Sequence, residues 1–274
     1  MKTCNLSDLL LRLPPSLCDC RTPVLIGPGA FARLDEMISM LGWTGKGVMV
    51  CEDQMIWTQK DRPHVFRTIP FDPEQLYVNP RSRFYLRMQL AGEASWLIAA
   101  GGEAVQGLTK LAAREFHIPY IAAPTCAYGS SFAASCTDLD DAGGYRRAVG
   151  AAPSAIVADT LLAASSGIPF GALRELIDRA AALARSRAFA LASGYVWNQQ
   201  SAEDQQYAID RALRCCSNGL REGDPSAFNA LYSALVICGL SGEVNKNAPR
   251  ALARLKDAPV PAGRKGECHE NAGN

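Results

Sequence analysis

The residues that best indicate chemistry form a double-glycine turn, Gly101-Gly102. The turn follows the apolar run 96–100 and precedes a helical pattern over 103–116. Glycines let backbone N–H groups approach an anion closely, and the first turn of a helix adds about half a positive charge. The turn therefore favours a phosphate group, although a tight strand-to-helix turn without any ligand explains the same two glycines.

A second polar loop follows the next apolar run, 120–123, and contains Thr125, Ser130 and Ser131. In a parallel sheet, ligands bind beyond the carboxyl ends of the strands, where both loops are expected to lie. The two serine hydroxyls either contact such a ligand or satisfy backbone groups of the loop. The sequence shows no Asp/His pair that would make either serine a nucleophile.

Short β-type runs and helical patterns must position these loops. The β-type runs are 24–26, 48–51, 65–69, 96–100, 120–123 and 155–158, each bounded by glycine, proline or acidic residues. Apolar residues recur at helical spacing over 30–41 and 103–116. This alternation is typical of βαβ units, so we expect an α/β fold with a Rossmann-like parallel sheet covered by helices.

After residue 160 the β-type runs stop and helical patterns replace them. Stretches rich in Ala, Leu and Arg cover 173–193, 202–216 and 225–238, and Gly219 and Gly239 suit helix C-terminal caps. Residues 245–274 show weak periodicity, which predicts an irregular tail. We therefore expect an α/β domain over 1–160 and an all-helical C-terminal domain over 161–274.

Composition excludes several classes of protein. The 274 residues carry 28 Lys and Arg against 27 Asp and Glu, so no overall charge attracts nucleic acid or anionic lipid. No run is long enough for a membrane span, and the N-terminal residues do not form a secretory signal. The ten cysteines contain no CxxC pair and only three histidines accompany them, so a Cys/His metal site is not expected. We predict reduced thiols and a cytoplasmic location.

Five motifs follow one another along the chain: Gly27-Pro28-Gly29, Glu52-Asp53, the segment from Gly101-Gly102 to Lys110, the segment 118–125 and the segment 153–160. In this order they resemble the glycerol-1-phosphate dehydrogenase branch of the iron-containing alcohol dehydrogenase and dehydroquinate synthase-like superfamily. The resemblance covers roughly residues 20–240. The resemblance implies a nucleotide-binding N-terminal domain and a C-terminal helical domain for metal and substrate, here shortened, with NAD(P)-dependent, metal-assisted hydride transfer between them.

The resemblance also implies how a cofactor, NAD or NADP, would bind. Gly101 and Gly102 would hold the pyrophosphate, and Thr125 would lie beside the nicotinamide half. Glu52 or Asp53 would reach the ribose of the adenosine.

Catalytic and metal-binding roles follow in the same way. Lys110 matches the helix lysine of the family's glycine motif, and Ser130 takes the place of an aspartate that helps to position cofactor and substrate. Asp178 falls where the family has a metal-binding aspartate, which would help to hold Zn²⁺ or Fe²⁺. An exposed carboxylate that pairs with Arg174 is the alternative for Asp178.

The chain departs from the family's pattern at several of these positions. Glu103 stands in place of the third glycine of the turn, and Gly107 in place of an aspartate. The family completes its metal site with two later histidines, whereas His269 is the only histidine here after residue 117. A metal held by Asp178 alone would be labile.

Three hypotheses of function result. The first is an NAD(P)-dependent oxidoreductase acting on a small alcohol or carbonyl compound, phosphorylated or not. The second is a catalytically impaired homologue that serves as a binding or partner subunit, and the third is a non-redox cyclase or lyase resembling dehydroquinate synthase. We expect a small-molecule substrate and no nucleic acid or membrane partner, while a homo-oligomer and a complex with a partner protein both stay open.

Overall fold

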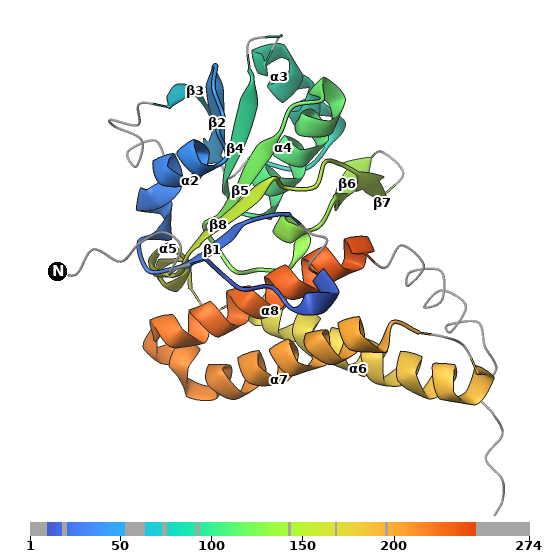
Figure 1. The fold of residues 1–274 in the computed structure, drawn as a ribbon. Coiled ribbons are helices and arrows are strands. Elements are labelled where there is room, and N and C mark those ends of the chain that lie inside the picture. The colour runs from blue at the N-terminus through green and yellow to red at the C-terminus, as the bar shows by residue number, and fades with distance from the viewer. Residues whose placement is uncertain are drawn as a thin grey trace, which may run out of the picture.

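A sheet of six parallel strands forms the centre of the protein (Figure 1). The computed structural model describes residues 10–17, 21–52, 64–72, 76–90, 92, 94–141, 144–167, 169–194 and 197–244. All six predicted strands are confirmed, with ends that differ by at most two residues. In the order in which they pair, they are β1 (Val24–Gly27), β8 (Ala155–Asp159), β5 (Tyr120–Pro124), β4 (Trp96–Gly101), β2 (Gly47–Glu52) and β3 (Val65–Phe71).

Both faces of the sheet are buried, because alternate residues of each strand enter two separate apolar cores. In β4, Leu97 and Ala99 join one core, whereas Trp96 and Ile98 join the other. This is why the strands read in the sequence as continuous apolar runs rather than alternating ones. The confirmed fold class is therefore an α/β architecture with helices on both faces.

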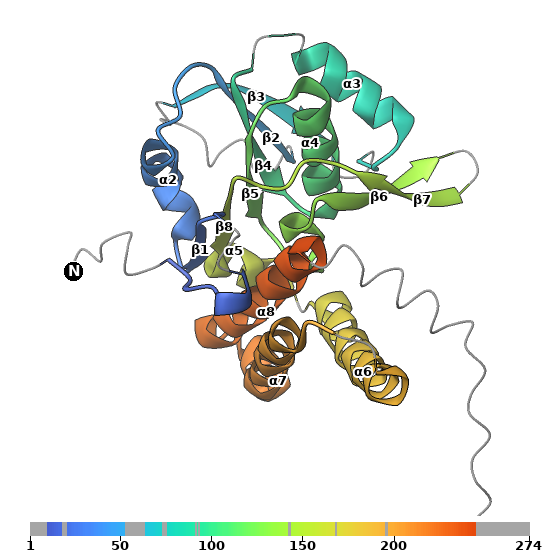
Figure 2. The same cartoon turned by 45° about the vertical axis from the view of Figure 1, so that its right-hand side comes forward.

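Different helices cover the two faces (Figure 2). One face packs against α3 (Pro80–Leu90) and α4 (Glu103–Phe116), and α4 has the predicted bounds. The other face packs against η2 (Ala30–Arg33), a 3-10 turn, and α2 (Leu34–Met40), which together form the helix predicted over 30–41. The sequence patterns did not indicate α3.

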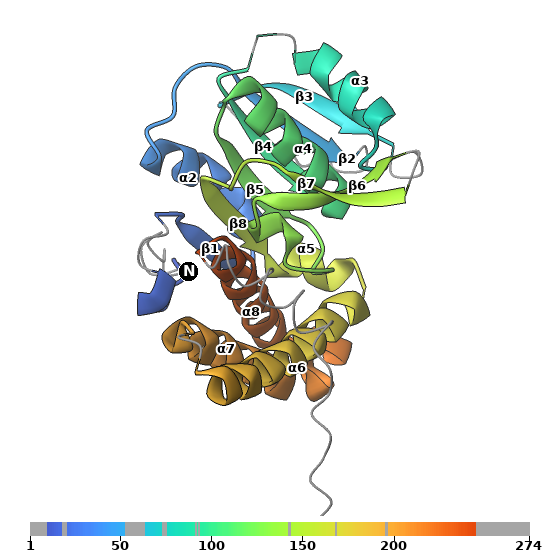
Figure 3. The same ribbon diagram turned by 90° about the vertical axis from the view of Figure 1, so that its right-hand side faces the viewer.

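The C-terminal region is all-helical, as predicted (Figures 1 and 3). It consists of α5 (Thr160–Ser165), α6 (Phe170–Ser193), α7 (Gln199–Glu222) and α8 (Pro225–Val244). Apolar residues of α8, such as Phe228 and Leu235, join the same core as α3 and α4. Helix α8 thus packs against the sheet, while α6 and α7 lie on the side of α8 that faces away from the sheet (Figures 1 and 3).

The predicted caps at Gly219 and Gly239 are wrong, because both glycines lie inside helices. Helix α7 continues to Glu222 and ends at Gly223, which has a left-handed φ of 70°. A Cβ on Gly219 would lie 2.9 Å from Ala227 Cβ, and one on Gly239 would lie 2.6 Å from Ala133 Cβ. These two glycines therefore allow close packing rather than helix termination.

An antiparallel hairpin follows β5 that the sequence patterns did not indicate. It consists of β6 (Cys136–Asp141) and β7 (Gly144–Val149), and it projects from the body (Figure 2). No residue of β7 is buried, and β6 is rich in aspartate. The hairpin therefore lacks the apolar run by which the central strands were recognised.

Two further predictions concern cysteines and membranes. In the described ranges, Cys51, Cys126, Cys136, Cys215, Cys216 and Cys238 are all free thiols. No helix among the described residues is long and apolar enough to cross a bilayer.

Candidate functional site

Strands β2 and β4 meet at the point where the chain reverses its direction across the sheet. From β2 the chain continues outward to β3, and from β4 it continues to β5 on the other side. Open α/β sheets bind ligands outside the carboxyl ends of strands at such a switch point. Glu52 ends β2, and Gly101 ends β4 immediately before Gly102. The fold thus brings three of the predicted nucleotide-binding residues to one place.

Gly102 is the N-cap of α4, and its backbone N–H donates to Glu52 Oε1 at 2.9 Å. An N–H at a helix N-terminus is an anion-binding group, and here a carboxylate of the chain itself accepts its hydrogen bond. A Cβ on Gly102 would lie 3.1 Å from Glu52 Oε1 and 3.3 Å from Cys126 Sγ. The glycine therefore permits this close approach. Asp53, the alternative ribose contact, lies outside the described residues.

The two glycine-bearing loops enclose a small cavity beside this turn. Its empty volume is about 210 Å³, and Gly102, Gln106, Cys126 and Tyr128 are among its lining residues. Gln106 is 1% exposed, and its Oε1 has no hydrogen-bond partner among the described residues. A buried acceptor of this kind calls for a donor from a water molecule or a ligand. Only about 10 Å³ of it is enclosed, room for about one water molecule, whereas ligands usually fill pockets of about 300–1,000 Å³.

Two carboxylates, Glu52 and Glu103, give the cavity a negative electrostatic potential. Burial, followed by the negative charges of Glu52 and Glu103, raises the pKa of the Cys126 thiol to about 12. Glu103, which replaces the family's third glycine, is the first residue of α4. A pyrophosphate at this turn has to tolerate or displace these carboxylates.

Thr125 is held against the glycine turn, since its backbone N–H donates to Gly101 O at 3.3 Å. The structure therefore brings this predicted nicotinamide neighbour together with the predicted pyrophosphate site. Both residues lie at the ends of adjacent paired strands, where Gly101 is in register with Pro124.

Lys110 is fully buried in α4 and its ammonium binds backbone carbonyls of the segment that follows β5. Lys110 Nζ donates to Ala134 O at 2.6 Å, to Cys136 O at 3.1 Å and also to Ser131 O. These bonds tie the loop after Ser130 to helix α4. In this arrangement Lys110 positions the loop.

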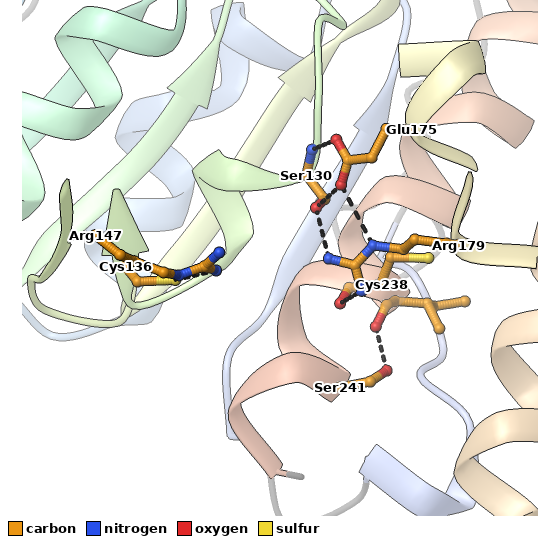
Figure 4. Close-up of polar contacts among 8 residues, drawn as sticks. Ser130, Cys136, Arg147, Glu175, Arg179, Cys238 and Ser241 are labelled. Atoms are coloured by element: carbon orange, nitrogen blue, oxygen red, sulfur yellow. Dashed lines mark hydrogen bonds and ion pairs between the residues drawn. The ribbon is translucent and has the colours of Figure 1, made fainter. Parts of the chain in front are cut away.

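Ser130 is 3% exposed and lies in a network that joins its loop to α6 and α8 (Figure 4). Ser130 Oγ donates to Glu175 Oε1 at 2.5 Å, and the Ser130 backbone N–H donates to Glu175 Oε2 at 3.0 Å. Arg179 donates to Ser130 Oγ at 3.3 Å, to Glu175 Oε1 at 3.4 Å and to Cys238 O at 3.1 Å. The network connects the strand ends to the helical region.

Sequence reasoning missed Glu175 and Arg179 and chose Asp178 on the same helix. Asp178 is exposed, whereas Glu175 and Arg179 share a helix face with the buried Ala172 and Leu176. An i, i+4 Glu–Arg pair in register with buried apolar residues was the available signal. That signal is weak, because the same spacing occurs on many solvated helices.

The described residues do not form a metal site around Asp178. Within the described ranges, no group of three or more His, Cys, Asp or Glu side chains could hold a metal ion. His117 is the left-handed C-cap of α4, and His269 lies outside the described residues.

Asp159, at the end of β8, accepts backbone hydrogen bonds rather than facing the cavity. Its carboxylate accepts from the N–H groups of Gly29, Phe31 and Leu161 at 2.9–3.1 Å. It therefore caps α5 and holds the turn after β1. This explains the acidic residue of the motif 153–160 without a ligand.

Comparison with known proteins places this geometry in a family context. The model of the iron-containing alcohol dehydrogenase family matches residues 25–166, which include all but the first residue of β1, the strands β2 to β8 and α4. No curated protein matches the chain.

Solved structures share the fold at low sequence identity. Maleylacetate reductase from Rhizobium sp. strain MTP-10005 has a TM-score of 0.60 and 16% identity over 84% of this chain and 64% of its own. Glycerol dehydrogenase from Schizosaccharomyces pombe has a TM-score of 0.62 and 17% identity, over 79% and 59%. Sulfoacetaldehyde reductase from Bifidobacterium kashiwanohense, solved in complex with NAD⁺, has a TM-score of 0.61 and 17% identity, over 80% and 65%. The chain thus spans less than two thirds of the length of these proteins.

Proposed function

The chain belongs to the iron-containing alcohol dehydrogenase family, and from this membership we propose that it is an NAD(P)-dependent oxidoreductase acting on a small alcohol or carbonyl compound. The resemblance of its motifs to the glycerol-1-phosphate dehydrogenase branch makes a phosphorylated compound our first choice of substrate. The six free thiols among the described residues support the cytosol as its compartment.

One observation carries the proposal: the Gly101-Gly102 turn opens α4 at the switch point of the sheet, with Glu52 beside it. Such a turn offers backbone N–H groups and a helix dipole to a pyrophosphate. A carboxylate at the end of the neighbouring strand suits the ribose hydroxyls of a dinucleotide. The orphaned acceptor of Gln106 beside the turn also favours a bound molecule.

In this proposal Glu52 and the nucleotide would exchange places. The Gly102 N–H would bind the pyrophosphate, and the released Glu52 carboxylate would accept from the ribose hydroxyls. A bound nicotinamide would supply the hydride chemistry. Thr125 orients that half of the cofactor, since its backbone is fixed to Gly101.

Ser130 is the residue that we propose to hold a proton at the substrate oxygen. Its Oγ is already hydrogen-bonded to a carboxylate oxygen of Glu175, which can accept the proton. Arg179 orients both groups. We assign no step to Zn²⁺ or Fe²⁺, because the described side chains around Asp178 do not fit such an ion.

A second candidate is a homologue without catalysis that serves as a binding or partner subunit. It is favoured by the internal pairing of the site, where Glu52 satisfies Gly102 and Glu175 satisfies Ser130. The small size of the cavity supports the same candidate.

Titration of the purified protein with NADH and NADPH, followed by nucleotide fluorescence with and without added Zn²⁺, distinguishes the two candidates. The oxidoreductase requires binding of at least one nucleotide below millimolar concentration. It also requires turnover of that nucleotide with a small aldehyde or ketone. Binding without turnover would support the second candidate, and absence of binding would exclude the first.

A further inference from the structure

Helix α6 leaves most of its length uncovered. It has 24 residues, yet only Ala172 and Leu176 are buried, and both lie in its first third. The second half is apolar all the same, with Leu191 at 78% exposure. An apolar helix half without a buried residue indicates that another element covers it.

A groove runs between this half of α6 and the first half of α7. Its volume is about 820 Å³, and its apolar lining includes Leu183, Leu191, Trp197 and Ala202. The groove is separate from the cavity at Gly101-Gly102, since the two share no lining residue. A helix of two to three turns is an occupant of suitable size.

We propose that residues 249–256 of the same chain dock in this groove as a short helix. These residues read Pro-Arg-Ala-Leu-Ala-Arg-Leu-Lys, so Leu252 and Leu255 lie on one helix face. Pro249 suits the first position of a helix. The docked face would cover Leu183 and Leu191.

The position of the end of α8 supports this occupant. Arg179 of α6 donates to Cys238 O of α8, and from this contact both helices run to the right in Figure 1, with their C-terminal ends spreading apart. A helix rises about 1.5 Å per residue. Along α8, Val244 therefore lies about 9 Å beyond Cys238, and along α6 the span from Leu183 to Leu191 lies about 6–18 Å beyond Arg179. Residues 245–248 would connect the two, with a reach of about 3.3 Å per residue.

Charge complementarity supports it as well. The α7 wall carries Glu203 and Asp210, which accept hydrogen bonds from the amides of Gln199 and Gln206 at 2.7 and 2.8 Å. Among the described residues, no ion pair involves either carboxylate. Arg250 and Arg254, spaced by one helix turn, offer the matching cations.

Hydrogen exchange of the full-length chain tests the proposal from the side of the docking segment. The variant Leu252→Asp/Leu255→Asp should raise amide exchange over 181–193 at least tenfold, because undocking frees this half of α6. The control Val260→Asp/Ala262→Asp adds the same charge beyond the segment and should leave exchange unchanged. Sedimentation should show the same oligomeric state for both variants and for the wild type.

Limited trypsin digestion tests it from the side of the groove. Docking shields Arg254, so Leu191→Asp should speed cleavage after Arg254 at least tenfold while cleavage after Arg264 stays constant. Unchanged exchange in the Leu252→Asp/Leu255→Asp variant, or equally fast cleavage after Arg254 in the wild type, would overturn the proposal. Protection of 181–193 that instead rises with protein concentration would assign the groove to a second copy and would overturn it too.

Discussion

Glu52 has two competing roles at the proposed nucleotide site. It accepts from Gly102 in the free chain, where it repels an incoming pyrophosphate, and in the complex it would bind the ribose. The substitution Glu52→Gln should therefore tighten the binding of inorganic pyrophosphate by about three- to tenfold, as expected for about 1 kcal/mol of relieved repulsion. The same substitution should weaken NADH binding about tenfold through the lost ribose contact. Calorimetric titrations with pyrophosphate and with NADH measure the two affinities. If the substitution raised both affinities or lowered both, the exchange of places would be contradicted.

Cys126 makes the stability of the protein sensitive to alkaline pH. Its folded pKa is about 12, while the ordinary pKa of an exposed thiol is 9.0, so the unfolded chain loses this proton first. The contribution of Cys126 is fully present below pH 9 and is lost as the pH rises through the folded pKa. We expect Cys126→Ser to reduce the fall in the free energy of unfolding between pH 9 and pH 11. Urea unfolding at both pH values measures this free energy. An equal fall in variant and wild type would contradict the contribution of Cys126.

At the scale of single residues, sites formed by strand ends could be predicted from the sequence better than sites that depend on the orientation of helix side chains. Gly101, Gly102 and Glu52 could be predicted to converge because parallel strands end at one edge of the sheet. The choice of Asp178 over Glu175 could not be settled, because it depends on which face of α6 meets the loop. Only the packing of Ala172 and Leu176 decides that rotation.

At the scale of elements, Gly239 sets the distance between α8 and the loop that carries Ser130. A Cβ there would lie 2.7 Å from Ser130 O, too close for real contacts. Gly239→Ala should destabilise the protein by up to about 2 kcal/mol, because an overpacking cost of about 1–3 kcal/mol is offset by a helix-propensity gain of only about 1 kcal/mol. Denaturant unfolding measures the change. Ser233→Ala in the same helix is the control, with an expected change within about 0.5 kcal/mol. A stabilised Gly239→Ala variant would contradict the packing described.

The network of Ser130, Glu175 and Arg179 couples three elements. Arg179→Met removes donors to all three partners and should lower the free energy of unfolding by about 1–2 kcal/mol, since each net hydrogen bond contributes about 1 kcal/mol and the pair is partly exposed. A double-mutant cycle with Ser130→Ala should give a coupling energy of at least about 0.5 kcal/mol. Additive effects would show that the two residues act independently.

Most elements could be predicted because their signals are local. The central strands are apolar runs, and α4 has an apolar stripe between a glycine turn and a strand. The hairpin β6–β7 could not, since its strands are polar and Lys110 holds the start of β6. The helical positions of Gly219 and Gly239 could not either, since they depend on tertiary packing against Ala227 and Ala133. From the sequence alone, a glycine inside a packed helix cannot be distinguished from a C-terminal helix cap.

At the scale of the whole molecule, the chain joins a six-stranded parallel sheet to a helical region, and it spans less than two thirds of solved structures with this fold. It covers 64% of maleylacetate reductase and 65% of sulfoacetaldehyde reductase. The nucleotide-binding part of the proposal depends on the sheet, which the family model matches. The proton-holding part depends on contacts between the sheet and α6.

The dissociation constant for NADH of wild type and Gly102→Asp, measured by fluorescence titration, tests the central claim most directly. An aspartate at this N-cap would place a second carboxylate beside Glu52, where the pyrophosphate must bind. Ser193→Asp, at the exposed end of α6, is the matched control. The account predicts binding below millimolar concentration for wild type and control, and at least tenfold weaker binding for Gly102→Asp. Absence of binding to the wild type, or equal affinity of Gly102→Asp and wild type, would contradict it.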